Sequence, residues 1–364
     1  MESPLLQIHQ SLNAKLGDFA GWAMPLEYPA PVGGGTLTEH EAVRTNAGLF
    51  DVSHLGKIEI YGTGAKEWLN SILTNDLNKI LPGQAQYSML CNEAGGVIDD
   101  LIVYRKSDTD LFLIPNASNT SSVFEILKAQ APAAIEVKNL HQQYGVIALQ
   151  GPSSVAALKE IGIESNMDYM QFVNTSIDNC PVILCRTGYT GELGFEIIPS
   201  WQDAQKVWDK LIAVVEKLNG CACGLGARDV LRTEMGYPLH GHELSLQISP
   251  VEAGASWAVG WKKESFRGKK VLTEQKENGS KLKLKVILAK DRGIPRKEMQ
   301  VKDQSGKVIG VVTSGTFSPS LKKGIGLALI NSEVSKGDQV VIDIRGADSP
   351  FEVVSLPFVE SKVR

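Results

Sequence analysis

The sequence has no long run of apolar residues and nothing at its start that resembles a secretory leader. No stretch approaches the roughly 18 uninterrupted apolar residues that a membrane-spanning helix needs. The first residues also lack a basic segment followed by an apolar one. We therefore expect neither secretion nor membrane insertion. With 364 residues, the chain is long enough for about two or three domains with sizeable cores.

An excess of positive charge is also missing. The 37 Lys and Arg residues are balanced by 41 Asp and Glu residues, for a net charge of −4. Proteins that bind nucleic acids or anionic membranes usually carry a basic surface, so neither is expected as a partner. The 35 glycines and 16 prolines are too few for a low-complexity or disordered chain.

Cysteine is scarce, because the chain has only five, an odd number with no CxxC pair among them. This pattern is typical of a reducing compartment, so we expect the protein to be cytoplasmic. Cys221 and Cys223 could hold a metal only together with His240 and His242, because a closed zinc site needs four ligands. Small buried thiols are the favoured interpretation, and we expect no metal.

Hydrophobic periodicity divides the chain near residue 280 into a body of helices and strands and an all-β tail. In the body, apolar residues at helical spacing predict a helix over 201–219. A helix over 36–46 is predicted with Thr38 and Glu41 as a capping box. Shorter helices are expected at 65–73, 118–129 and 153–160.

Strands in the body follow one another through turns and do not alternate regularly with long helices. They are predicted at 57–61, 97–105, 111–115, 144–150, 181–186 and 195–199. Six short strands are predicted in the tail, at 282–288, 299–301, 308–313, 325–329, 339–344 and 351–354. The sequence therefore predicts an α+β fold with antiparallel sheets and a small C-terminal β-barrel.

Two adjacent aspartates, Asp99 and Asp100, stand within an apolar strand. Because neighbouring strand residues point to opposite faces, one of the two carboxylates must face the interior. A buried carboxylate is costly unless it is paired or protonated, and such groups are often functional. The residues alone leave two interpretations open: a working carboxylate, or a pair that caps a turn or binds a lysine.

Two glycine-containing segments could bind a ligand or be purely structural. The segment 185–196 allows close approach to a flat polar ligand, yet it could be only a hairpin turn. It lacks GxGxxG and the phosphate-loop lysine, which disfavours dinucleotides and nucleoside triphosphates. The segment 224–234 opens a short helix, in which Arg228 could bind a carboxylate or pair with Asp229 or Glu234.

Two further features carry little information by themselves. His54 could be a general base, although a structural histidine is the favoured interpretation. The segment 312–321 is predicted to be a polar loop between two strands, and most such loops are only connections.

Eight segments, spread over the whole chain, combine these features into a longer pattern. They are 18–26 (DFAGWAMPL), 48–54 (GLFDVSH), 92–101 (NEAGGVIDDL), 149–152 (LQGP), 186–192 (RTGYTGE), 224–229 (GLGARD), 313–319 (TSGTFSP) and 357–359 (PFV). In their order along the chain and in their residues, these segments resemble those of the aminomethyltransferases (T-proteins) of the glycine cleavage system. The segment 28–36 is richer in proline and glycine than the usual family pattern, so the entry to the first long helix is expected to differ.

The resemblance implies an enzyme that transfers the one-carbon unit of an aminomethyl group from lipoyl H-protein to tetrahydrofolate. Ammonia is released and 5,10-methylenetetrahydrofolate forms. The implied co-substrate is tetrahydrofolate, with no metal and with lipoate only through H-protein. Functional links to P-protein (glycine decarboxylase) and L-protein (dihydrolipoyl dehydrogenase) are implied as well.

The resemblance also implies a domain organisation and a set of site residues. A folate-binding body over 1–280 is expected, with interleaved lobes 1–55 with 140–280 and 56–139, followed by a barrel domain over 281–364. The family's catalytic aspartate matches Asp100, and its pterin-recognising glutamate matches Glu196. A pterin edge presents adjacent N–H donors that an ionised carboxylate can accept. The other family positions around the folate match Tyr87, Asn116, Tyr169, Tyr189 and Arg228.

Two alternative functions stay open at this point. Demethylases of the same superfamily reuse the folate scaffold, but the oxidising members carry a flavin domain whose GxGxxG this chain lacks. Folate-binding accessory proteins of tRNA modification or iron–sulfur maturation are binding modules with a KGCYxGQE signature. The comparable segment here, 186–192, has no cysteine, so the aminomethyltransferase is favoured.

Overall fold

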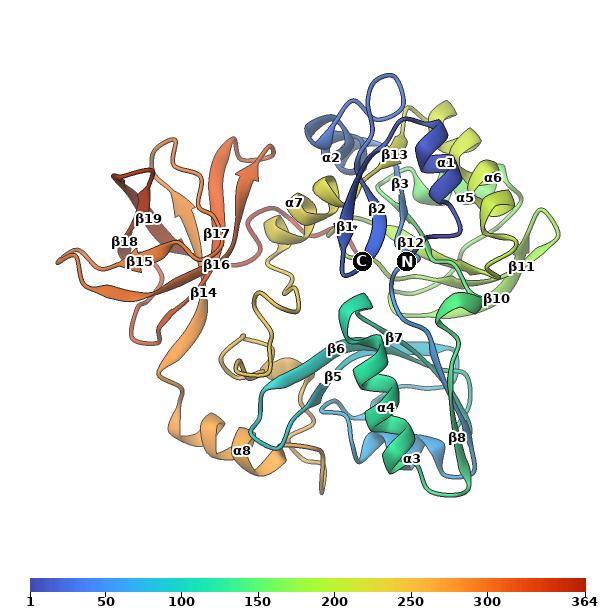
Figure 1. Cartoon of the computed structure of the whole chain (residues 1–364), viewed down its shortest axis with the longest axis horizontal. Helices are drawn as coiled ribbons and strands as arrows, with labels where there is room; N and C mark the ends of the chain where they lie inside the picture. Colours follow the sequence, from blue (N-terminus) through green and yellow to red (C-terminus); the bar gives the residue numbers. More distant parts are fainter.

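The structure is a computed structural model that describes residues 1–364. It contains two open sheets, a two-stranded hairpin and a closed barrel (Figure 1). The barrel, in orange and red, lies to one side of the body, and the two open sheets lie in the upper and lower parts of that body (Figure 1). The predicted α+β fold with antiparallel sheets and a C-terminal barrel is confirmed.

The first open sheet has six strands in the order β10-β11-β12-β9-β3-β13. They are β3 (Gly48–Asp51), β9 (Ile147–Gln150), β10 (Phe172–Ile177), β11 (Cys180–Cys185), β12 (Gly194–Pro199) and β13 (Cys221–Cys223). Neighbours run antiparallel except β3 and β13, which are parallel. The helices around this sheet are α1 (Leu6–Ser11), α2 (Thr36–Thr45), α5 (Ser154–Glu160) and α6 (Ala204–Lys217) (Figure 1).

The second open sheet has five strands in the order β5-β6-β7-β4-β8. They are β4 (Ile58–Gly62), β5 (Gln84–Cys91), β6 (Val97–Arg105), β7 (Asp110–Pro115) and β8 (Ile135–Asn139). Helices α3 (Ala65–Asn70) and α4 (Thr120–Gln130) pack on one face. This sheet is inserted in sequence between β3 and β9, which pair directly. We propose the division into lobes 1–55 with 140–280 and 56–139 on this basis.

The tail forms a barrel whose strands close in the order β14-β17-β16-β15-β18-β19. They are β14 (Leu282–Ala289), β15 (Gln300–Lys302), β16 (Val308–Ser318), β17 (Lys323–Asn331), β18 (Gln339–Ile344) and β19 (Ala347–Val354). All six predicted tail strands are present. We propose residues 281–364 as a separate domain, because ten buried apolar residues form its own core.

The polar loop predicted at 312–321 is wrong for most of its length, since β16 continues to Ser318. Two hydroxyl side chains of this stretch, Ser314 and Ser318, contact helix α7 (Leu225–Met235) of the body. Arg232 of α7 donates to Ser314 Oγ at 2.8 Å, and Ser318 donates to Glu234 Oε1 at 2.5 Å. Because partners on α7 satisfy the hydroxyls of Ser314 and Ser318, polar residues can occupy inward positions of this strand. The sequence therefore lacks the alternation of apolar and polar residues that predicts a strand.

Helices α6 and α2 show how far local sequence determines structure. The periodic apolar residues of α6 are buried against the six-stranded sheet, which confirms the helix predicted over 201–219. Helix α2 is also present, but its predicted capping box is wrong. The helix begins one turn earlier than that box requires, after Gly35, whose φ of 86° suits glycine, and Thr38 donates instead to the Gly34 carbonyl at 3.1 Å.

Both predicted hairpins are confirmed, one formed by β6 and β7 and one by β11 and β12. The remaining elements include the hairpin of β1 (Lys15–Phe19) and β2 (Trp22–Glu27), the helix α8 (Lys269–Asn278) and the 3₁₀ turn η4 (Ser256–Ala258). None of the helices is both long and apolar enough to span a bilayer.

Candidate functional site

A cavity of about 190 Å³ lies between the two open sheets and is closed on one side by α7. All seven residues matched by resemblance line it, namely Tyr87, Asp100, Asn116, Tyr169, Tyr189, Glu196 and Arg228. Tyr87 comes from β5, Asp100 from β6, Glu196 from β12 and Arg228 from α7. The fold therefore brings together side chains from distant parts of the sequence.

Asp100 stands on β6 just before the point where β7 begins to pair with it, at Leu101. On the other side, Tyr87 of β5 pairs with Ile102, so Tyr87 and Asp100 are diagonal neighbours on one face of the sheet. The Tyr87 hydroxyl donates to Asp100 Oδ2 at 3.0 Å. Burial raises the pKa of Asp100, and the Tyr87 and Asn116 donors partly oppose this.

Asp99, the other member of the pair, is fully buried and does not line the cavity. Its carboxylate accepts hydrogen bonds from Asn116 and Asn119, at the corner where β7 leads to α4. The alternative that the pair binds a lysine is wrong, because Asn116, Asn119 and Tyr87 are the groups that donate to the two carboxylates. Of the two aspartates, Asp100 alone lines the cavity.

Glu196 lies on the opposite wall, on β12 between Cys185 of β11 and Ala148 of β9. Burial raises its pKa, while Thr187 Oγ1 donates to Glu196 Oε2 at 2.5 Å and favours the ionised form. Thr187 begins the glycine-rich turn, which Gln150 holds through bonds to the Thr187 and Phe195 carbonyls at 3.1 and 3.2 Å.

Gly188 and Gly194 leave room in this turn for the side-chain amide of Gln150. A Cβ atom at either position would overlap the side chain of Gln150. The close approach therefore lets one buried amide fix both ends of the turn beside Glu196. The turn carries Tyr189 into the cavity wall, where its hydroxyl donates to the Pro238 carbonyl.

Arg228 sits in the first turn of α7 with its guanidinium 4.4 Å from the centre of the Tyr189 ring. Burial lowers its pKa, although the guanidinium stays charged at any physiological pH. The pairing with Asp229 or Glu234 that the sequence left open is wrong: Arg232 binds Asp229, and Glu234 binds His40 and Arg44. Arg228 thus faces the cavity with donors that no protein carboxylate occupies.

The mouth of the cavity contains an aromatic residue that the sequence gave no reason to select. Trp257 of η4 is 68% exposed and stacks on Tyr87, with ring centres 5.2 Å apart. A second hollow of about 660 Å³ adjoins the first, and Tyr87, Tyr169, Met170 and Trp257 line both. A long flat ligand could therefore extend outward past Tyr169.

The other candidate residues lie away from this cavity. His54 is buried, with a pKa lowered to about 3 by burial and by the charge of Arg228, and it does not line the cavity. His240 and His242 contact the Val97 carbonyl and Ser314 Oγ. Cys221 and Cys223 are buried on β13 with their sulfurs 3.8 Å apart. These four do not converge on a metal site.

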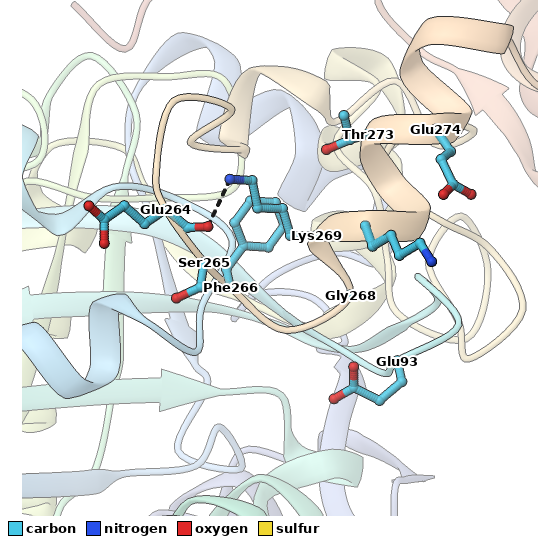
Figure 2. A pocket seen from close by; sticks show the side chains of 9 residues that line it. Glu93, Glu264, Ser265, Phe266, Gly268, Lys269, Thr273 and Glu274 are labelled. Atoms are coloured by element: carbon cyan, nitrogen blue, oxygen red, sulfur yellow. Dashed lines mark hydrogen bonds between the residues drawn. The ribbon is translucent and has the colours of Figure 1, made fainter.

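A separate hollow of about 550 Å³ lies beside α8 (Figure 2). Figure 2 shows Glu93, Glu264 and Glu274 around it, with the Lys269 ammonium turned to the Glu264 carbonyl at 2.9 Å. Its charges are mixed, and Phe266 is its one apolar residue. It contains none of the residues matched by resemblance.

In chemical terms, the main cavity offers an apolar, aromatic slot with two carboxylates on opposite walls and one free guanidinium. A carboxylate such as Glu196 can bind a pair of N–H donors on a heterocycle. A carboxyl such as Asp100, whose pKa is raised by burial, is a stronger proton acceptor than an ordinary carboxylate. These features suit a flat, nitrogen-rich substrate.

Family models and curated relatives match this chain over nearly its whole length. The GCVT N-terminal domain matches residues 5–263, and the glycine cleavage T-protein C-terminal barrel domain matches residues 283–360. The curated aminomethyltransferase of Parafrankia sp. (strain EAN1pec) is 51% identical over 362 residues, covering 100% of this chain and 98% of the relative. That of Mycobacterium tuberculosis (strain ATCC 25618 / H37Rv) is 49% identical over 366 residues, with the same coverage of 100% and 98%.

A solved structure of the same family has the same fold as this chain. The glycine cleavage system aminomethyltransferase T from Bartonella henselae superposes with a TM-score of 0.93 at 35% identity, covering 100% of this chain and 99% of that one. Both the sequence relationship and the fold extend from the first lobe through the barrel. The chain therefore belongs to the glycine cleavage T-protein family, the tetrahydrofolate-dependent aminomethyltransferases.

Proposed function

We propose that the cavity between the two sheets is where the aminomethyl carbon is passed from the lipoyl arm of H-protein to tetrahydrofolate. The observation that carries this proposal is the convergence of all seven resemblance-matched residues on one cavity. The released amino group leaves as ammonia, and the carbon becomes part of 5,10-methylenetetrahydrofolate. No three or more His, Cys, Asp or Glu side chains lie together in a way that could bind a metal ion. No step in this proposal uses a metal.

Asp100 is proposed as the catalytic carboxylate. Its position inside the slot and its raised pKa suit a group that orients the folate nitrogens and takes a proton from them as they bind the carbon. A well-placed general base typically contributes about 10²–10⁴-fold to the rate. Holding the folate and the lipoyl arm in one cavity adds the benefit of proximity.

The other six residues are proposed to bind folate. Glu196, on the wall facing Asp100, is proposed to accept the N–H groups of the pterin edge. The rings of Tyr87, Tyr169 and Tyr189 line the slot for flat groups, Arg228 supplies N–H donors, and Asn116 lines the slot beside Asp100. The hollow beyond Tyr169 gives the rest of the folate a way out of the slot.

The proposed partners are lipoyl H-protein as the direct carrier, with P-protein and L-protein acting on the same carrier in the other steps of glycine cleavage. Lipoate is proposed to enter only on H-protein. We also propose a reducing, cytoplasmic location, since all five cysteines are free thiols.

The test is release of ammonia from aminomethyl-loaded H-protein, measured with and without tetrahydrofolate. We expect rapid release only with both substrates. Asp100→Asn should reduce turnover by about two orders of magnitude or more while folate binding measured by calorimetry persists. Near-normal turnover of that variant would remove Asp100 from its role, and folate-independent release at the full rate would remove the proposed reaction.

A further inference from the structure

The two adjacent aspartates are joined through a single amide group. Asn116 Nδ2 lies 3.0 Å from Asp99 Oδ1, 2.9 Å from Asp100 Oδ1 and 2.9 Å from the Asp100 carbonyl. An amide NH₂ has two hydrogens, so these three oxygens compete for them. Any change at Asp99 therefore changes what Asn116 offers to Asp100.

Asp99 reaches this amide from the far side of the strand. It shares the face of Leu101, which belongs to the core under α4, and it is fully buried. Its Oδ2 accepts the Asn116 backbone N–H at 3.0 Å, and its Oδ1 also accepts Asn119 Nδ2 at 2.7 Å. Since Asp99 does not line the cavity, it cannot touch a substrate there.

The charge of Asp100 also acts on Asp99. Burial raises the pKa of both, and the charge of Asp100 raises that of Asp99 further. Two carboxyls that interact this strongly lose their protons as a pair, in two steps. The other titratable groups that face Asp100 are Tyr87 from β5, Tyr189 from the glycine turn and His240 from the segment after α7.

We propose that Asp99 is a positioning residue for aminomethyl transfer, which acts on Asp100 through the side-chain amide of Asn116 and never touches the substrate. This inference rests on the proposed function of Asp100. Asp99 holds Asn116 so that Asn116 and Tyr87 each occupy one oxygen of Asp100.

The central experiment is the pH profile of kcat/KM for ammonia release from aminomethyl-loaded H-protein, in the full chain and in Asp99→Asn. Asparagine has one acceptor oxygen where the carboxylate has two, so it holds Asn116 less firmly; the donation of Asn116 to Asp100 weakens and the pKa of Asp100 rises. We expect the rising limb of the profile to move about one pH unit toward alkaline pH. We also expect kcat to fall by about tenfold or more through lost positioning, with folate affinity unchanged by calorimetry.

Two control variants separate positioning from general structural damage. Asn119→Ala removes a donor to Asp99 on the side away from Asp100 but keeps both carboxyls. We expect it to leave the midpoint of the rising limb closer to that of the native chain than Asp99→Asn does. The pH profile of His240→Gln should still show a rising limb. This result would exclude titration of His240 as its cause and assign the limb to the aspartates. An unchanged midpoint in Asp99→Asn, or a parallel loss of folate affinity, overturns the proposal.

A second measurement does not depend on Asp99→Asn folding. With ¹³C at the aspartate carboxyl carbons, NMR should show two coupled titrations above the usual aspartate range in the native chain. In Asp100→Asn only one remains, and we expect its midpoint at lower pH because the neighbouring charge is gone. An unchanged midpoint contradicts the coupling. If Asp100→Asn keeps near-normal turnover, the proposed function fails; if it is inactive while the profile of Asp99→Asn is unchanged, only the present proposal fails.

Discussion

The hydroxyl of Tyr87 donates to Asp100 Oδ2 at 3.0 Å while Asn116 donates to the other carboxylate oxygen. The two donors come from opposite flanks of β6, so both oxygens of Asp100 are committed before any substrate arrives. A carboxylate held from two sides loses little further freedom when it acts, which is the physical basis of preorganised catalysis.

Tyr87→Phe should therefore raise the pKa of Asp100, because a donor that favours the ionised form is lost while burial remains. The rising limb of the pH profile should move toward alkaline pH, as expected for Asp99→Asn, because both changes weaken a donor to Asp100. We expect kcat near neutral pH to fall about tenfold, the size of one hydrogen bond to a charged group. Tyr61→Phe, at an exposed tyrosine of β4, is the matched control, and an unshifted limb in Tyr87→Phe would contradict the assignment.

Thr187→Val tests the wall opposite Asp100. Valine keeps the shape of threonine but removes the donor to Glu196, so the pKa of Glu196, already raised by burial, should rise further. Because the ionised glutamate is the form proposed to accept pterin N–H groups, folate affinity at pH 7 should fall about tenfold. The affinity should recover as the pH is raised. Thr187→Ser should bind like the native chain, and a pH-independent loss in Thr187→Val would argue for a packing defect.

Trp257→Ala tests the mouth of the cavity. The ring is 68% exposed and its main contact in the mouth is Tyr87, so we expect the free energy of unfolding to change by less than about 0.5 kcal/mol. Folate affinity should fall about three- to tenfold, the range of one aromatic contact. Trp257→Phe should retain most of it. Quenching of the exposed tryptophan by folate would be measured alongside, and quenching that persists in Trp257→Phe would place folate elsewhere.

Glu234→Gln tests the junction of the body and the barrel. Burial opposes ionisation of Glu234, but His40, Arg44 and Ser318 together hold its pKa at about 2, below the ordinary value of 4.5. The ionised form therefore stabilises the fold by roughly 3 kcal/mol above about pH 5, and this is lost as the pH falls toward 2.

The variant should accordingly be less stable than the native chain at pH 7, with the difference shrinking at pH 3, as measured by urea unfolding. Glu277→Gln, at an exposed glutamate near the end of α8, provides the control with no expected change. A difference that is the same at both pH values would show that packing, and not charge, explains the loss.

The fold was predictable from sequence where a local pattern repeats. Helix α6 has an uninterrupted apolar stripe, and most tail strands alternate in the barrel register. Strand β5 was missed because its buried residues include Gln86 and Ser88, whose partners lie on other elements. The β1–β2 hairpin was missed because its turn depends on Ala20 at a φ of 53°, which no local rule predicts.

The site residues that belong to recognisable sequence motifs could be predicted, and the others could not. The resemblance selected seven residues, and all of them line one cavity. Trp257 was missed because it belongs to no recognisable motif, and only the fold brings it to Tyr87. The amide bridge from Asn116 to both aspartates was equally invisible, since it depends on where β7 ends relative to β6.

The place of β3 between β9 and β13 in its sheet has a consequence for how the protein is made. One neighbour, β9, follows about a hundred residues later, and the other, β13, begins at Cys221. At the usual pace of about 5–20 residues per second, a ribosome needs roughly 10–30 s to deliver both. During that interval the nascent strand has bare hydrogen-bonding edges, so this segment is where we expect chaperones to be needed most.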